Sequence, residues 1–560
     1  MQTLTLSRRI SFVLTLSALV STGLLRAVTP TATWTGAVDG DLGKSGNWTP
    51  VTTPYTPQPD SDLVFGSSAS TDLTGTLQVG AASSFTFLAG APSYTYHVPY
   101  AQTFQIDGGG ILNNSGVTQT LSIDAGNVTF QNSPVLTNAT IAVNGSTTSN
   151  SYGALYLFGT TSAGNSTIIN NAGTVQFDGG GFTTTAINST LGSATVINNG
   201  GVGLGGFITI NGSAGSATLI ANGGLAANQS GGGIRFQGGS GSSATITVNG
   251  GSGSNSQAGG IVFQNSSTAG NATVTLNGGT SGGGGAYAYF YNTTTGGSAK
   301  FVLNTGSTLD IGQTDFGDVV SFGSVEGAGR IYLGGRTMQV GSLNTDTTIS
   351  GLVSDMGLGG QTGGSLDKVG TGKLTLTNDD TYTGPTTVSA GTLSINGSVT
   401  SNVEVKSGAT LKGIGTVYGA VTVDAGGILS PGNSPGTITM RTLSLNDTSI
   451  LDFELGTVSD RVAVTTSGGL TLDGILNISD SGGFDPSQTY TLFTASGSVT
   501  DNGLQIGSVP AGYSASDFAI SVVGTQVKFA AAVPEPGEIE LVLAGLGFCA
   551  FVGLRRPRSS

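Results

Sequence analysis

The chain has 560 residues, of which 95 are glycine, 37% are hydrophobic and only 9% are charged, and its net charge is −13. The hydrophobic content argues against a disordered chain. The acidic balance disfavours a nucleic-acid partner or an anionic membrane surface, because both require basic patches. The single cysteine, Cys549, excludes an internal disulfide.

The first 27 residues carry the features of an export signal. Arg8 and Arg9 precede an uncharged run at 10–25, and Ala27 is a suitable cleavage point. The run is shorter than the roughly 20 residues that a membrane-spanning helix needs. We therefore expect residues 1–27 to form a signal helix that is removed on export. An uncleaved membrane anchor is the alternative.

Residues 28–107 contain both tryptophans of the chain, Trp34 and Trp48. Together with 62–66 (Asp-Leu-Val-Phe-Gly), they resemble the start of surface proteins that carry autotransporter-type strand repeats. One interpretation of the tryptophans is a ligand platform. A solenoid, however, must cover its first coil against edge pairing. We therefore expect a terminal β cap in this region.

Residues 108–310 repeat one line of about 27 residues, as in 244–251 (Ala-Thr-Ile-Thr-Val-Asn-Gly-Gly) and 272–279 (Ala-Thr-Val-Thr-Leu-Asn-Gly-Gly). A fixed period in this range indicates one structural unit stacked on itself. Alternation places Ala244, Ile246 and Val248 on one face, which predicts a strand with one buried side. The Asn-Gly pair that follows predicts a turn with positive φ. The sequence therefore predicts an all-β fold, a right-handed parallel β-helix (β-solenoid).

Each of seven copies has an asparagine five residues after its first residue. If the coils stack, these amides can hydrogen-bond along the axis, although asparagine also suits each turn separately. No proline occurs between Pro134 and Pro385, as an uninterrupted sheet requires. The predicted structural ladder consists of Asn144, Asn171, Asn199, Asn222, Asn249, Asn277 and Asn304.

Residues 311–362 are expected to form transition rungs, and they bring charge back into the chain. Polysaccharide lyases built on β-helices use acidic residues to hold calcium and a basic residue to take a proton, and a comparable cluster is conceivable here. Irregular rungs that expose their charges explain the same residues equally well. The weak alternative site consists of Asp310, Asp315, Asp318 and Arg330, with Glu326 and Arg336 nearby.

Residues 363–440 contain the lines 366–376 (Leu-Asp-Lys-Val-Gly-Thr-Gly-Lys-Leu-Thr-Leu) and 390–393 (Ala-Gly-Thr-Leu). These lines resemble the autotransporter-associated β-strand repeat. The segment 429–436 (Leu-Ser-Pro-Gly-Asn-Ser-Pro-Gly) looks like the membrane-proximal end of such passengers. The likeness continues into a C-terminal β region at 441–530. The likeness implies a β-helix, but it says little about the activity of the protein.

The tail at 531–560 has Pro534-Glu535-Pro536, then an uncharged run at 541–554, then Arg555, Arg556 and Arg558. This order resembles the PEP-CTERM sorting tail. The arginines would stop transfer at the cytoplasmic face, and the run would form a short hydrophobic helix. Its length, about 21 Å, suits a transient anchor in the inner membrane. The resemblance implies an exosortase-type processing enzyme as a partner, acting near the Pro-Glu-Pro motif.

Side chains for catalysis are scarce. His97 is the only histidine, so a zinc site of the usual kind is not expected, and Cys549 lies in the tail. We therefore expect no metal, no cofactor and no enzymatic activity. The predicted function is an exported structural or adhesive protein of the cell surface, outer membrane or extracellular matrix. Its expected contacts are extracellular polysaccharide or further copies of itself, with no nucleic acid, and the membrane only through the C-terminal tail.

Two alternatives remain. One is a carbohydrate-active β-helix enzyme, a polysaccharide lyase or hydrolase, that uses the charges at 310–336. The other is a module whose flat Thr/Asn face binds a glycan or another ordered surface. In that face the Thr-x-Thr pattern is interrupted, because Ile220 takes the place of the second threonine after Thr218.

Overall fold

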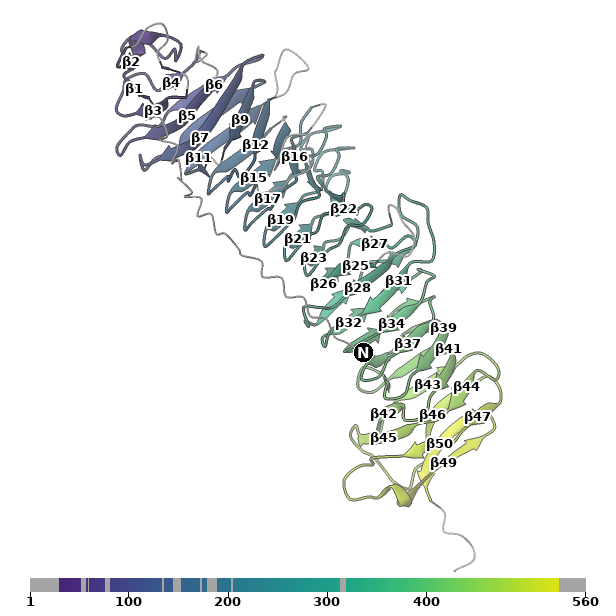
Figure 1. Cartoon of the computed structure of the whole chain (residues 1–560). Helices are drawn as coiled ribbons and strands as arrows, with labels where there is room; N and C mark the ends of the chain where they lie inside the picture. The colour runs from purple at the N-terminus through teal and green to yellow at the C-terminus, as the bar shows by residue number, and fades with distance from the viewer. Residues whose placement is uncertain are drawn as a thin grey trace, which may run out of the picture.

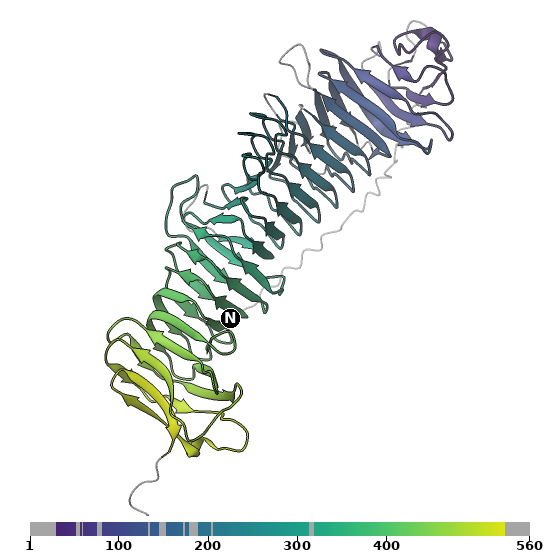
Figure 2. The ribbon, with the colours of Figure 1, turned by 180° about the vertical axis from the view of Figure 1, so that it is seen from behind.

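A computed structural model gives the structure of the chain, and the part it describes is an elongated rod without an α-helix (Figure 1). The chain advances along the rod in sequence order, as the view from behind also shows (Figure 2). The described part includes two short 3-10 helices, η1 (Ser45–Asn47) and η2 (Ala515–Asp517). The described residues are 30–51, 57–58, 60–75, 81–132, 135–144, 153–171, 174–178, 189–202, 205–312 and 319–532.

The first of three sheets, the proximal sheet, runs along one side of the N-terminal part of the rod. Its strands pair in parallel, apart from the antiparallel pair of β1 and β2. They are β1 (Thr31–Trp34), β2 (Trp48–Thr49), β3 (Asp62–Phe65), β5 (Ala81–Phe87), β7 (Thr103–Asn113), β9 (Asn127–Gln131), β10 (Val135–Leu136), β12 (Ala154–Phe158), β14 (Thr174–Asp178), β16 (Phe207–Ile210), β18 (Gly233–Gln237), β20 (Gly260–Gln264), β22 (Tyr287–Phe290), β24 (Thr308–Asp310), β27 (Arg330–Tyr332) and β30 (Val353–Ser354).

The second, the long sheet, is entirely parallel and extends along most of the rod, from β4 to β48. Its strands are β4 (Asp72–Leu73), β6 (Thr95–Val98), β8 (Gln119–Asp124), β11 (Ala139–Asn144), β13 (Thr167–Asn170), β15 (Thr195–Asn198), β17 (Thr218–Ala221), β19 (Thr245–Val248), β21 (Thr273–Leu276), β23 (Lys300–Leu303), β26 (Ser324–Gly327), β29 (Thr347–Ile349), β32 (Lys373–Leu376), β35 (Thr392–Ile395), β38 (Thr410–Gly413), β40 (Ile428–Pro431), β42 (Ile450–Leu455), β45 (Ile475–Asp480) and β48 (Gln505–Ile506).

The third, the distal sheet, begins at β25, before the proximal sheet ends at β30, and it closes with the antiparallel hairpin of β49 and β50. Its strands are β25 (Val319–Phe322), β28 (Thr337–Val340), β31 (Ser365–Lys368), β33 (Asp379–Asp380), β34 (Thr386–Val388), β36 (Ser398–Val399), β37 (Val403–Val405), β39 (Thr416–Val423), β41 (Thr437–Leu445), β43 (Arg461–Val464), β44 (Leu470–Leu472), β46 (Tyr490–Ala495), β47 (Val499–Asp501), β49 (Phe518–Val523) and β50 (Gln526–Ala531).

The alternation in the repeat line sets the core, as the sequence predicts. Ala244, Ile246 and Val248 are all buried between the sheets. Opposite them, Phe236, Phe263 and Phe290 stack along the axis, with ring centroids 4.9 and 4.6 Å apart and interplanar angles of 7° and 16°. Successive coils place identical side chains above one another, so flat rings fill the thin core without gaps. The predicted all-β parallel β-helix is confirmed.

One predicted turn is wrong. The glycines after the ladder asparagines, such as Gly250, do not have positive φ. Instead they permit close stacking, because a Cβ on Gly250 would lie 2.4 Å from the backbone of Gly278 in the next coil. The left-handed residue of each coil lies in a different turn, for example Gly192 at φ +60° and Gly215 at φ +61°. Contact between coils, rather than a turn with positive φ, therefore requires glycine at these positions.

Candidate functional surfaces

The predicted asparagines lie in one line along the edge of the long sheet. In each of six steps, the side-chain Nδ2 donates to the Oδ1 of the asparagine one coil earlier, at 2.7 to 2.8 Å. The line runs from Asn304 to Asn144 without a break and always in the same direction. Each interior amide therefore donates a hydrogen bond to one neighbouring coil and accepts one from the other. The amide dipoles thus point in the same direction along the rod.

The ladder ends on a charged group. Asn144 Nδ2 donates to Asp124 Oδ1 at 3.0 Å, and the other carboxylate oxygen lies 2.7 Å from His97 Nδ1. The second ring nitrogen of His97 lies 3.4 Å from Asp72 Oδ1. Burial raises the pKa of Asp124, but its hydrogen bonds with His97, Asn144 and Ser122 outweigh burial and lower it. His97 thus continues the ladder as a structural residue.

The outer face of the long sheet presents a column of threonines beside the asparagines. These threonines are in register from coil to coil and are exposed or half-buried. The next column changes from isoleucine at Ile169, Ile197 and Ile220 to threonine at Thr247 and Thr275. From Thr140 to Thr275 this face carries no charged residue, and its threonine and asparagine columns are regular. The threonine column is Thr95, Thr120, Thr140, Thr167, Thr195, Thr218, Thr245 and Thr273.

A second polar series, not predicted from the sequence, marks another corner of the coil. In most repeats a Ser or Thr hydroxyl accepts the N–H of the residue two positions later, as Thr190 does from Gly192 at 3.1 Å. Its sequence signal is a hydroxyl four residues before the first residue of the repeat line in six of the seven copies; the first copy has Val135 there. The series is Ser162, Thr190, Ser213, Ser240, Thr268 and Thr295, and these residues form parallel bridges from coil to coil.

The structure describes two residues of the weak alternative site, Asp310 and Arg330, and each has a contact of its own. Asp310 is 1% exposed, and its carboxylate accepts the N–H groups of Gly312 at 2.8 Å and Leu358 at 3.0 Å. Arg330 is exposed and donates to the Tyr332 hydroxyl at 3.4 Å. Asp315 and Asp318 lie outside the described residues. Asp310 thus holds the 355–364 loop against the proximal sheet.

The neighbouring charges are also engaged elsewhere. Glu326 pairs with Lys300 at 2.7 Å, and buried Arg336 donates to the Asn292 carbonyl. Within the described ranges no three His, Cys, Asp or Glu side chains are grouped as a metal site would require. None of the helices among these residues is long and apolar enough to span a membrane.

The tryptophans do not form a ligand platform. Trp34 and Trp48 are 2% and 1% exposed, and their ring centroids lie 5.1 Å apart in an edge-to-face contact. The Trp48 indole donates to the Leu42 carbonyl at 2.9 Å, and β2 pairs along the free edge of β1. Both rings are thus part of the core beneath the first coil. The function of this region as a cap stays a prediction.

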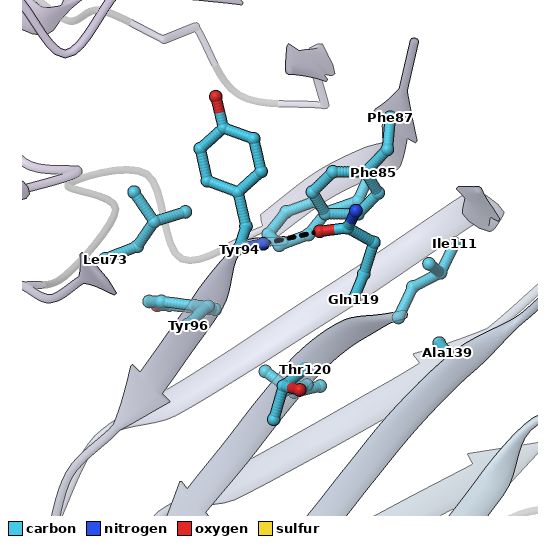
Figure 3. Close-up of a pocket in the computed structure, with 10 residues that line it drawn as sticks. Leu73, Phe85, Phe87, Tyr94, Tyr96, Ile111, Gln119, Thr120 and Ala139 are labelled. Atoms are coloured by element: carbon cyan, nitrogen blue, oxygen red, sulfur yellow. Dashed lines mark hydrogen bonds between the residues drawn. The ribbon is translucent and has the colours of Figure 1, made fainter. Parts of the chain in front are cut away.

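Just beyond the tryptophans lies a small enclosed cavity of about 10 Å³, lined by aromatic rings from β5 and β6 (Figure 3). Buried Gln119 accepts the backbone N–H of Tyr94 at 2.8 Å. A space of this size holds one water molecule at most. The cavity is therefore too small for an organic ligand.

Buried charges appear in the distal part of the rod. Lys368 is 2% exposed, and its ammonium group donates to the carbonyls of Val369, Gly370 and Ala390 at 2.9, 2.9 and 3.1 Å. Asp380 is 1% exposed and accepts the Val353 N–H at 2.8 Å. Burial raises the pKa of Asp380 to about 7. Both groups hold neighbouring coils together, and neither was singled out from the sequence.

Comparison with known proteins finds one similarity around Lys368. Residues 366–395 match the Passenger-associated-transport-repeat. In the structure this segment is one coil and a half, in which Lys368 closes the first turn and fully buried Tyr382 fills the core. The predicted likeness of this segment to an autotransporter-associated strand repeat is confirmed. The likeness indicates a passenger-type β-helix.

The chain is also similar to the Adhesin BmaC autotransporter of Brucella suis biovar 1 (strain 1330). The two are 39% identical over 106 residues, which are 17% of this chain and 3% of that adhesin. The chain thus spans only a small fraction of the length of this relative. The predicted sorting residues Pro534, Glu535 and Pro536 and the arginines Arg555, Arg556 and Arg558 lie outside the described residues, as does the signal segment 1–27.

Proposed function

We propose that this chain is an exported, non-enzymatic β-helix that serves as a structural or adhesive rod on the cell surface or in the extracellular matrix. The observation that carries the proposal is the passenger-type repeat within a rod whose adjoining coils repeat a single uncharged pattern. Such a rod holds its outer faces rigidly at a fixed spacing of about 4.8 Å per coil. The similarity to an adhesin segment supports the same class of function.

The two ends of the chain support the export route. The N-terminal signal directs the chain out of the cytoplasm, and the tail at 531–560 holds it transiently in the inner membrane until an exosortase-type enzyme acts near Pro534-Glu535-Pro536. The contacts that this function requires are with extracellular polysaccharide or with further copies of the chain. The enzyme alternative is weaker, because the Asp310 carboxylate is buried and already binds two backbone N–H groups.

Export and sorting are tested in the producing bacterium with the full-length chain. Antibody labelling of intact cells should detect the rod, and externally added protease should remove it. Changing Pro534, Glu535 and Pro536 together to alanine should leave an unprocessed precursor in the inner membrane. The matched control changes Pro510, a proline in the loop between β48 and η2, to alanine, and processing should be unaffected. Cells without the gene should adhere or aggregate less, and the wild-type gene should restore both.

Two results would contradict the proposal. The first is a chain that stays inside the cell with its N-terminus intact. The second is depolymerisation of an acidic polysaccharide by the purified chain that disappears in Asp310→Ala or Arg330→Ala. The second result would establish the enzyme alternative, because a protein that only binds polysaccharide does not depolymerise it.

A further inference from the structure

The outer face of the proximal sheet carries aromatic side chains that do not belong to the core. Phe207, Tyr287 and Tyr289 are half-buried, and the residues between them in each strand, such as Ala288, point inward and are buried. Strand pairing places Phe207, Tyr287 and Arg330 in one column and Arg235, Tyr289 and Tyr332 in the next, with buried Asp310 between Tyr289 and Tyr332. The strands β16, β22 and β27 lie on one side of the rod (Figure 1). Five coil steps of about 4.8 Å make this surface about 24 Å long. The aromatic strip consists of Phe207, Arg235, Tyr287, Tyr289, Tyr291, Arg330 and Tyr332.

Glycines let the rings of the strip lie flat. A Cβ on Gly233 would lie 2.5 Å from the Phe207 ring, and a Cβ on Gly260 would lie 2.2 Å from the Tyr287 ring. Glycine weakens a strand interior unless another group needs the space. Here the ring of the neighbouring coil occupies it. The Tyr287 and Tyr289 rings stack at 4.5 Å and 25°. The backbone at Gly260 therefore lies against the Tyr287 ring, and the Tyr289 ring stacks beside it.

The strip is also the place where positive charge appears on this part of an acidic chain. Between residues 125 and 299 the only charged residues are Asp178 and Arg235. The Arg235 guanidinium lies 4.6 Å from the centroid of the Phe207 ring, which orients it along the surface. Arg330, exposed at the other end, lies four coil steps or about 19 Å away. The tyrosines of β22 lie midway between the two arginines.

This pattern matches an extended polymer better than a folded partner. A stable protein interface needs a broad apolar centre, whereas the strip is only two side chains wide. Flat rings present a surface for the C–H faces of sugars, and arginine binds carboxylates through paired hydrogen bonds. Exposed Met356 and Leu358, in the loop that Asp310 holds, lie at the Arg330 end of the strip.

We propose that the aromatic strip binds a linear polysaccharide that carries carboxylates, with sugar rings on Tyr287 and Tyr289 and carboxylates on Arg235 and Arg330. The inference rests on the proposed function, since it names the component that the exported rod contacts. Binding needs no bond to break, so no catalytic residue is assigned.

The test uses the purified full chain and three probes: polygalacturonate, its methyl-esterified form and neutral dextran. Affinity electrophoresis should detect binding to polygalacturonate, and esterification should weaken it about tenfold. Combined Tyr287→Ala and Tyr289→Ala should weaken binding about tenfold or more, whereas the corresponding Phe variants should retain it. Combined Arg235→Gln and Arg330→Gln should make the two forms of polygalacturonate bind equally. Tyr418→Ala and Arg461→Gln, which change exposed residues of the distal sheet, are the matched controls.

Circular dichroism and thermal melting establish that each variant is folded. The inference is overturned if the strip variants bind polygalacturonate like the controls, if dextran binds equally well, or if no polysaccharide binds the wild-type chain. Surface display and adhesion that persist in those cases leave the proposed function standing. A chain that binds polygalacturonate through the strip in vitro but is never exported would instead contradict the proposed function alone.

Discussion

The repeat segment at 135–303 and the distal segment at 319–506 use one long sheet but are held together in different ways. The repeat segment makes the same amide contact six times and contains one carboxyl residue, Asp178. The distal segment relies on single buried charges such as Lys368 and Asp380. When a solenoid makes many equal contacts, each coil contributes a small share of its stability. Where single buried charges hold the coils, a few coils contribute most. A change of pH or one substitution there should alter the free energy of unfolding strongly.

The largest expected effect is the pH dependence of Asp380. One carboxylate oxygen accepts the Val353 N–H, and the other is buried with no hydrogen-bond partner among the described residues. Burial raises its pKa from 3.8 to about 7, so the folded chain binds an extra proton between these values. The contribution to the free energy of unfolding is fully present below pH 3.8 and is lost as pH rises through 7. The loss amounts to about 4 kcal/mol.

Hydrogen exchange measured by mass spectrometry at pH 4.5, 6 and 8, after correction for the intrinsic exchange rate, should locate this loss in the coils around 353–405. Asp380→Asn should remove the dependence there, because the amide keeps the neutral form at every pH. Asp447→Asn, a change at an exposed carboxyl elsewhere in the distal segment, is the control. Asp460, whose pKa burial raises to about 6, should give a second pH-dependent region. If hydrogen exchange in the repeat segment depended on pH to the same extent, the two segments would not differ in how they are held together.

The second effect is the removal of a buried cation. Lys368→Met leaves the carbonyls of Val369, Gly370 and Ala390 without their shared donor and removes a buried cation, and we expect the free energy of unfolding to fall by about 3 kcal/mol. Lys373→Met is the matched control, since its ammonium group is exposed and lies 3.9 Å from Asp346. That substitution should cost less than about 0.5 kcal/mol. Local hydrogen exchange in β31 and β34 measures the difference between the two variants. If both substitutions lower the free energy of unfolding equally, the hydrogen bonds of Lys368 do not hold the coils together.

The contrast also explains what the sequence could predict. The strands, their buried faces and the asparagine column can be predicted from the sequence, because seven copies share one pattern despite local exceptions. Lys368 occurs once, and it was not singled out, although alternation places it on the same face as buried Leu366. The sequence alone leaves Asp310 in a catalytic alternative, because it does not show that Leu358 of the 355–364 loop donates its N–H to Asp310. The aromatic strip needs the register of several coils, which the sequence leaves open.

The smallest expected effect separates the two roles of the ladder asparagines. Asn249 makes two ladder bonds, at 2.8 Å to Asn222 and 2.7 Å from Asn277, whereas Asn304 donates only one, at 2.7 Å. If the ladder stabilises the rod, Asn249→Ala should cost about 1 to 2 kcal/mol and Asn304→Ala about half of that. If each asparagine serves only its own turn, the two substitutions should cost the same. Thr247→Ala, on the outer face of the same strand, controls for the loss of a polar side chain. Hydrogen exchange should show the effect of Asn249→Ala in the coils on both sides, because an interior amide holds two neighbours, and a change confined to its own coil would identify the turn role.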